Sequence, residues 1–430
     1  MTGRPAMTSV AATARRVYLS LGFMQGIIFG MWGLTAVVWW VVELDLRPLR
    51  LVLLGSFLVG TMLLAEIPTG VVADAYSRKW SIVVSWVVMA AALALAPITA
   101  FFPIMLVWQV LYAVGWTFQS GADTAWVTDE TGVEDDALIM RHAIFRSLGL
   151  LVGIALGALG GQWSLRGTMV LAGCAAGLYA VGLARVMQEH AFTPVEQTEG
   201  RRQQMVDIWS DGWTTVRASV ALIAMFLSVV LSSMAAEAIN TLDTPRLVEL
   251  GLEDYSGAQA VAWFGAVWFV MTLVNIPIMV LAERRLDDVE ERVAAGWLVV
   301  LWLAAGIGIF LLAGPWLWIG VIGWLVRDVA AEVTEPLTIA WANRRAESAV
   351  RATVISFRGQ AQALGELVGG LALGVVAELI SIAAALTVAG VLLCLAAIPF
   401  VLLRRQTPLG SGRSGQLAFE GTEELPGPLR

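Results

Sequence analysis

Residues 65–80 read AEIPTGVVADAYSRKW, and this turn joins two long apolar stretches, 50–73 and 80–101. A helix needs about 20 predominantly apolar residues to cross the hydrocarbon of a bilayer, and each stretch meets this length. Since only a few polar residues separate the two stretches, the helices must run antiparallel. The sequence here predicts a helical hairpin embedded in a membrane.

The same pattern extends over the whole chain of 430 residues, of which 58% are hydrophobic and only 14% are charged. Soluble domains carry about 25% charged residues to cover their surface. We therefore predict an all-α membrane protein with twelve transmembrane helices in two six-helix bundles. The predicted spans are 17–42, 50–73, 80–101, 104–127, 142–163, 167–187, 217–241, 257–282, 294–313, 316–341, 352–378 and 381–403.

Positive charges are distributed unevenly between the predicted loops. With the N-terminus inside, the cytoplasmic segments hold 20 of the 27 Lys and Arg residues, the outer loops hold 4 and the spans hold 3. Because Lys and Arg favour the cytoplasmic side, we predict that both termini are cytoplasmic and that the protein lies in the cell membrane. The predicted domains are a cytoplasmic N-terminus (1–16), a first bundle (17–187), a cytoplasmic linker (188–216), a second bundle (217–403) and a disordered cytoplasmic tail (404–430).

The residue inventory excludes several classes of function. Lys79 is the only lysine and follows Arg78, so the chain has no Gly-Lys-Ser/Thr phosphate loop for ATP-driven pumping. The two histidines and two cysteines lie far apart, and no basic cluster suits nucleic acid. We expect no enzyme activity, catalytic residue, metal, cofactor or nucleic-acid partner. A gradient-driven transporter, a channel and a membrane receptor or scaffold remain.

The two predicted bundles resemble each other in sequence, which indicates duplication in parallel orientation. Chance gives one local match easily but hardly three in chain order. The matches are Glu66-Ile-Pro68 with Asn275-Ile-Pro277, Asp123 with Glu335, and Phe145-Arg146 with Phe357-Arg358.

The turn from Gly70 through Asp74 to Arg78-Lys79 resembles the signature loop of the major facilitator superfamily, which reads Gly, three residues, Asp, Arg, any residue, Gly, Arg, Arg/Lys. Ala75 and Ser77 depart from that pattern. Glu66-Ile-Pro-Thr-Gly and Ser120-Gly-Ala-Asp-Thr-Ala-Trp126 look most like the branch of macrolide and tetracycline drug:proton antiporters. The resemblance covers all twelve predicted spans, and it implies a transporter that works by alternating access as a monomer.

Our leading interpretation is proton-coupled efflux of amphipathic or cationic small molecules, with the substrate, protons and the lipid bilayer as partners. Acids outnumber bases in the predicted cavity. Proton-coupled uptake of an organic solute or anion is the alternative, because Ala158 stands where the antiporter motif has a proline. In that case Arg327 would bind the anion. A non-transporting receptor or scaffold is a remote third interpretation.

Ionisable residues inside a membrane are costly and therefore need a partner or a function. The family resemblance assigns a conformational latch to Gly70, Asp74, Arg78 and Lys79, although an ordinary helix-end loop would look the same. Two acid–base pairs lie at matching depths on consecutive predicted helices, and their duplication favours structural ion pairs. These pairs are Asp123 with Arg146 and Glu335 with Arg358.

Three carboxyl groups are candidates for proton coupling. Glu66 lies two residues before Pro68, where a kink can change its exposure, and a structural hydrogen bond is the alternative. Asp328 and Glu332 share one helix face with Glu335, and a buried network without titration is the alternative. The candidates for lining the substrate cavity are Gln25, Glu237, Asn240, Arg327 and Glu366.

A glycine stripe occupies the fifth predicted span, at 149, 153, 157 and 161. Glycines that recur every four residues leave a smooth helix face. The stripe predicts that another helix approaches closely there.

Overall fold

The computed structural model describes residues 4–133, 135–193, 214, 216–217, 219–286, 291–345 and 351–406, and this part of the chain is helical with no strand. The linker prediction from 194 to 213 and the tail prediction from 407 onward lie outside the described residues. The elements are α1 (Arg4–Val38), η1 (Trp39–Glu43), α2 (Pro48–Ala75), α3 (Arg78–Leu95), η2 (Ala96–Ile98), α4 (Phe102–Gln119), α5 (Ala122–Thr131), α6 (Asp136–Gly161), α7 (Leu165–Val186), α9 (Val220–Glu249), α10 (Gly257–Leu286), α11 (Glu291–Ala313), α12 (Leu317–Arg345), α13 (Arg351–Leu379), α14 (Ile382–Ala396) and α15 (Ile398–Gln406).

Ten helices in the described ranges are long and apolar enough to cross a membrane: α1, α2, α3, α6, α7, α9, α10, α11, α13 and α14. The other two predicted spans correspond to α4 with α5, and to α12. The first of these is interrupted, and α12 carries four charged residues between 327 and 335. The prediction of an all-α membrane protein is confirmed.

The predicted continuous span 104–127 is wrong in one respect, because the helix breaks at Gly121. This residue has φ +75°, in the left-handed region that favours glycine, and it separates α4 from α5. Asp123 consequently lies in the first turn of α5. A carboxylate is favoured there by the helix dipole and the free backbone N–H groups.

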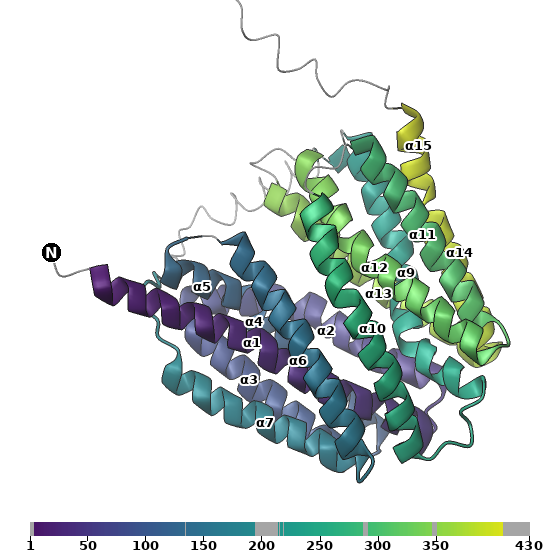
Figure 1. Cartoon of the computed structure of the whole chain (residues 1–430), viewed down its shortest axis with the longest axis horizontal. Coiled ribbons are helices and arrows are strands. Elements are labelled where there is room, and N and C mark those ends of the chain that lie inside the picture. The colour runs from purple at the N-terminus through teal and green to yellow at the C-terminus, as the bar shows by residue number, and fades with distance from the viewer. Residues whose placement is uncertain are drawn as a thin grey trace, which may run out of the picture.

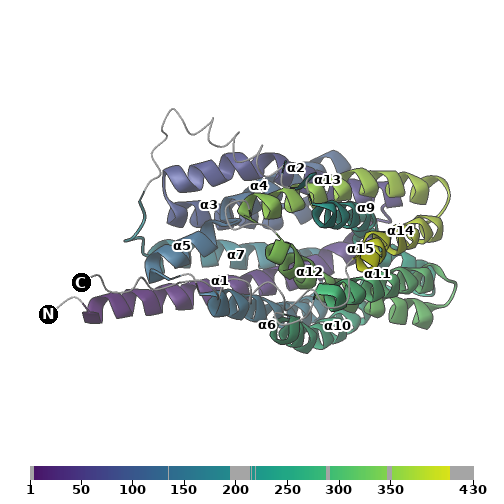
Figure 2. The ribbon, with the colours of Figure 1, turned by 90° about the horizontal axis from the view of Figure 1, so that it is seen from above.

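The helices form two halves, α1–α7 and α9–α15, that lie side by side (Figures 1 and 2). They meet where α2 packs on α13 and where α6 packs on α10. Since the helices alternate in direction, α1 begins and α15 ends at the same end of the molecule, which we call the terminal end. Close contacts between the halves, such as Gly374 with Val52 and Gly265 with Ala158, lie toward the other end, which we call the opposite end.

The glycine stripe of α6 packs directly on α1. A Cβ atom on Gly149 would overlap the backbone carbonyl of Phe23, and one on Gly153 would overlap that of Ile27. The partner helix has a stripe of its own at 22, 26 and 30, where a Cβ would meet the backbone of α6. The predicted close helix approach is confirmed, and both surfaces require glycine.

Candidate substrate cavity

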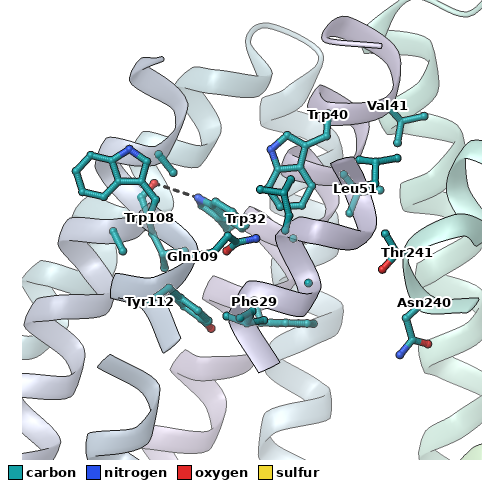
Figure 3. Close-up of a pocket in the computed structure, with 18 of the residues that line it drawn as sticks. Phe29, Trp32, Trp40, Val41, Leu51, Trp108, Gln109, Tyr112, Asn240 and Thr241 are labelled. Atoms are coloured by element: carbon teal, nitrogen blue, oxygen red, sulfur yellow. Dashed lines mark hydrogen bonds between the residues drawn. The ribbon is translucent and has the colours of Figure 1, made fainter. Parts of the chain in front are cut away.

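Three adjoining cavities lie between the two halves. The first, of about 370 Å³, is lined mainly by apolar side chains of the N-terminal half, several of them aromatic, and is called the aromatic cavity (Figure 3). The second, of about 630 Å³, contains Asp328, Glu332, Glu335 and Glu366 and is called the acidic cavity. A third cavity of about 420 Å³, called the connecting cavity, adjoins both, since it shares the lining residue Phe29 with the aromatic cavity and Glu332 with the acidic one.

One face of α12 lines the acidic cavity. Its acids at 328, 332 and 335 all border this space, as their spacing of four and three residues predicts. Glu335 forms an ion pair with Arg358 of α13, whose side chain is 9% exposed. Glu366 accepts a hydrogen bond of 3.0 Å from Gln362 Nε2 on its own helix. Glu332 has no hydrogen bond or ion pair among the described residues, so its carboxyl group is free to bind a ligand.

A polar network links α9, α10 and α12 at the edge of this cavity. Arg327 donates to Asn240 Oδ1 at 2.9 Å and lies 3.8 Å from Asp328. Asp328 also accepts a hydrogen bond of 2.6 Å from Asn275, the residue that replaces Glu66 in the second repeat. Arg327 and Asp328 are therefore held by neighbouring side chains.

The remaining cavity candidates occupy two different places. Gln25 lines the connecting cavity. Glu237 lines the aromatic cavity and is 9% exposed, and it accepts a hydrogen bond of 3.1 Å from Thr241. Its carboxyl group lies against Gly55 of α2, so it sits at the contact between the two halves.

The structure does not bring Asp123 and Arg146 together. Asp123 accepts hydrogen bonds from the Thr124 backbone N–H at 2.7 Å and from Gln119 Nε2 at 3.3 Å. Because the chain breaks at Gly121, this carboxylate faces the start of its own helix. Arg146 is exposed, lines the acidic and connecting cavities, and makes no ion pair among the described residues.

Glu66 lies on α2 and is exposed. Its described polar contact is a hydrogen bond of 3.5 Å from the hydroxyl group of Ser120, at the break between α4 and α5. It does not line any of the three described cavities. Its role in proton coupling stays a prediction.

The predicted latch residues lie at the terminal end of the N-terminal half. Arg78 lies 3.5 Å from Asp74 and forms a closer ion pair with Asp129 of α5. Its Nη1 also donates to the Ala125 carbonyl at 3.1 Å. Each of these contacts stays within the N-terminal half. Lys79 is held through its backbone N–H, and Gly70 faces open space.

Two acidic residues in this region were missed by the sequence analysis. Asp129 follows the predicted span and pairs with Arg78. Glu189 accepts hydrogen bonds from the Ser77 hydroxyl at 2.5 Å and the Lys79 N–H at 2.9 Å, and so caps the start of α3. The chain after α7 therefore packs against the loop between α2 and α3. An acid just after a span and another at the start of a polar linker are weak signals, because many solvated acids look alike.

A further missed contact ties the two halves at the opposite end. Glu378 near the end of α13 lies 3.4 Å from Arg47 and accepts a hydrogen bond of 3.4 Å from the Leu49 N–H. Leu49 belongs to the first turn of α2, where N–H groups have no partner within the helix. We call this contact the Glu378 tie.

Two helical halves in contact toward one end, with cavities between them, are an architecture found in membrane transporters. The family model of the Major Facilitator Superfamily matches residues 18–324, which is more than half of the chain. The protein belongs to this family.

Solved structures of transporters share the fold at low sequence identity. A peptide transporter POT in complex with sulfate has a TM-score of 0.72 at 13% identity, with 93% of this chain and 98% of that chain covered. The nucleoside transporter NupG gives 0.68 at 14%, covering 91% and 98%. A D-xylose-proton symporter gives 0.69 at 14%, covering 89% and 96%. A comparison with curated proteins found no significant match.

Proposed function

We propose that the protein exports amphipathic or cationic small molecules in exchange for protons, by alternating access, as drug:proton antiporters of the macrolide and tetracycline branch do. The supporting observation is the chemistry of the joined cavities. Aromatic side chains line one part, and four carboxyl groups line the other. Arg358 is neutralised by Glu335, and Arg327 is held by Asn240 and Asp328. Arg146 is a third arginine at the acidic cavity, so its four carboxyl groups exceed its positive charges by one, and this excess favours a cation.

The arrangement of the halves fits one state of this cycle. The halves are in contact toward the opposite end, and the acidic and connecting cavities separate α6 from α10 and α12 toward the terminal end. We propose that both termini lie in the cytoplasm and that the protein works as a monomer in the cell membrane. This state would then receive substrate from the cytoplasm. The latch around Asp74 would make its contacts with the C-terminal half when the terminal end closes.

Among the three coupling candidates, Glu332 has the best support. It borders both the acidic and the connecting cavity without a hydrogen-bond partner among the described residues. Asp328 is held by Asn275 and Arg327, and binding a proton would break those interactions. Glu66 is exposed on α2 beside the break between α4 and α5, so it would have to couple through movement of α2. Glu332 is the first residue to test.

Uptake of an organic solute or anion is the second candidate function, and Arg146 favours it. This guanidinium group faces the cavities without an ion pair among the described residues, and it could bind a carboxylate. A similar fold occurs in a D-xylose-proton symporter, which shows that the architecture alone does not set the direction of transport.

Transport into inside-out vesicles separates these functions. An imposed pH gradient, acidic inside, should drive accumulation of a cationic dye and not of an organic acid. Glu332→Gln should abolish this accumulation while gradient-free exchange of dye persists. Proton-driven loss of preloaded organic acid from these vesicles would instead favour the second function, because a symporter moves the acid out of the lumen together with the protons. No pH-driven transport of either compound would contradict both.

A further inference from the structure

Aromatic side chains from α1, η1 and α4 border the aromatic cavity (Figure 3). Trp32 of α1 and Trp40 of η1 stand edge-to-face, with ring centroids 5.8 Å apart at 75°. Phe29, one turn earlier, is 57% exposed although it lies between the halves. An aromatic face left uncovered inside a molecule can stack on a flat ligand. The other rings are those of Trp108, Tyr112 and Trp268.

A single charged residue borders this aromatic space. Glu237 is the one ionisable acid or base among the described residues that line it, apart from the phenol of Tyr112. It is buried, and Thr241 is its hydrogen-bond donor. A buried carboxylate without a positive partner is costly, and a cationic ligand would remove that cost. Ring faces attract cations as well, so both features act in the same direction.

The size and polarity of the cavity limit the class of ligand that it can bind. A volume of about 370 Å³ is in the range of pockets that hold drug-sized molecules. The polar side chains are few, with Gln109, Asn240 and Thr241 beside the acid. A sugar would leave many hydroxyl groups unpaired here. A fused aromatic ring system with one positive charge fits both the walls and the single acid.

The position of Glu237 ties this site to the transport cycle. Its side chain contacts Gly55 of α2 on one side and Gly370 of α13 on the other. Opening of the opposite end must separate α2 from α13, because these helices join the halves there. The carboxyl group would then lose its enclosure, and a bound cation would gain a path outward.

We propose that the aromatic cavity binds planar aromatic monocations, with Glu237 as their counter-charge. This inference rests on the proposed export function and names its substrate class. The substrate would lie against α1, α4 and α9, and the acids of α12 would bind protons.

Equilibrium binding to the purified full-length protein tests the site directly. The probes are ethidium, a planar aromatic monocation, and phenanthridine, its uncharged ring system. Glu237→Gln keeps the shape of the side chain and should weaken ethidium binding at least about tenfold, since it removes one partner of a buried charge pair. Phenanthridine binding should change by less than twofold. Phe29→Leu should weaken both probes, and Glu249→Gln, an acid paired with Arg246 at the opposite end, should change neither.

Unchanged ethidium affinity in Glu237→Gln would overturn the proposal. If that variant loses both probes, Glu237→Asp decides the matter, because it keeps the charge. Recovery of ethidium binding supports the counter-charge role, and no recovery contradicts it. Vesicle transport separates the two proposals. If ethidium binding depends on Glu237 but a pH gradient drives no ethidium transport, the proposed export function is contradicted and the proposed binding site stands. If the Glu237→Gln protein transports ethidium at the native rate, the proposed binding site is contradicted and the proposed export function stands.

Discussion

Replacing Glu378 with Gln should shift the protein toward the state in which the opposite end is open. The carboxylate joins the two halves in the present state through Arg47 and the Leu49 N–H. Glu378→Gln keeps the size of the side chain but removes its charge. Since both partners belong to α2 or the residue before it, the interaction must break when α2 leaves α13.

The size of this shift follows from the exposure of the partners. The Arg47 side chain is 76% exposed and the Glu378 side chain 21%, so the ion pair resembles surface pairs worth about 0.2–1 kcal/mol. The charge at a helix N-terminus adds about 0.3–1 kcal/mol. A total near 1 kcal/mol corresponds to roughly a fivefold change in the ratio of the two states. Salt of about 1 M should produce a similar shift in the native protein, because it screens exposed charges.

Thiol labelling measures the shift. Val52 is fully buried against Gly374, so a cysteine there becomes accessible when the opposite end opens. In a background with Cys174→Ser and Cys394→Ser, the labelling rate of Val52→Cys by a membrane-impermeant maleimide should rise roughly fivefold with Glu378→Gln. Glu249→Gln serves as the control, because that acid pairs within α9. A rate that stays constant or falls would refute the reasoning.

Three further predictions concern packing and charge. Gly153→Leu should prevent accumulation of folded protein in the membrane, whereas Gly182→Leu, which faces open space, should accumulate normally; equal amounts would contradict the packing argument. Asp129→Asn should lower the thermal unfolding temperature more than Asp74→Asn, because Asp129 forms the closer ion pair with the latch arginine; the reverse order would make Asp74 the main partner. Glu335→Gln should destabilise the protein by about 2 kcal/mol in denaturant titration, since it leaves a buried arginine without its partner although Glu335 itself is 53% exposed, and no measurable loss would argue against that pairing.

Much of the fold could be predicted from the sequence, because the length of an apolar stretch and the spacing of its glycines are both properties of a single helix. The apolar stretches became helices, and the α6 glycines became a contact surface. Contacts between two consecutive helices could also be predicted from the sequence, as the Glu335–Arg358 pair shows. These features depend on a local period, which a single sequence records directly.

Contacts between distant helices could not be predicted in this way. Glu378 and Arg47 are separated by 331 residues, and no local pattern relates them. Glu237 could be placed near the end of its helix, but its burial against Gly55 depends on how the halves meet. The aromatic cavity also depends on how distant helices pack, since from the sequence alone its tryptophans could equally have faced lipid.

The two repeats use the same acid–base pattern for different purposes. In the C-terminal half, Glu335 and Arg358 lie on unbroken helices at matching depth, and they pair. In the N-terminal half, the left-handed glycine at 121 turns Asp123 toward the start of α5, and Arg146 loses its predicted partner. That guanidinium instead borders the same two cavities as Glu332 of the other half. One glycine therefore converts a structural ion pair into a free positive charge opposite a free acid. We propose that closure of the terminal end brings the halves together there, so that an ionised Glu332 attracts Arg146 and favours closure more than a neutral Glu332 does.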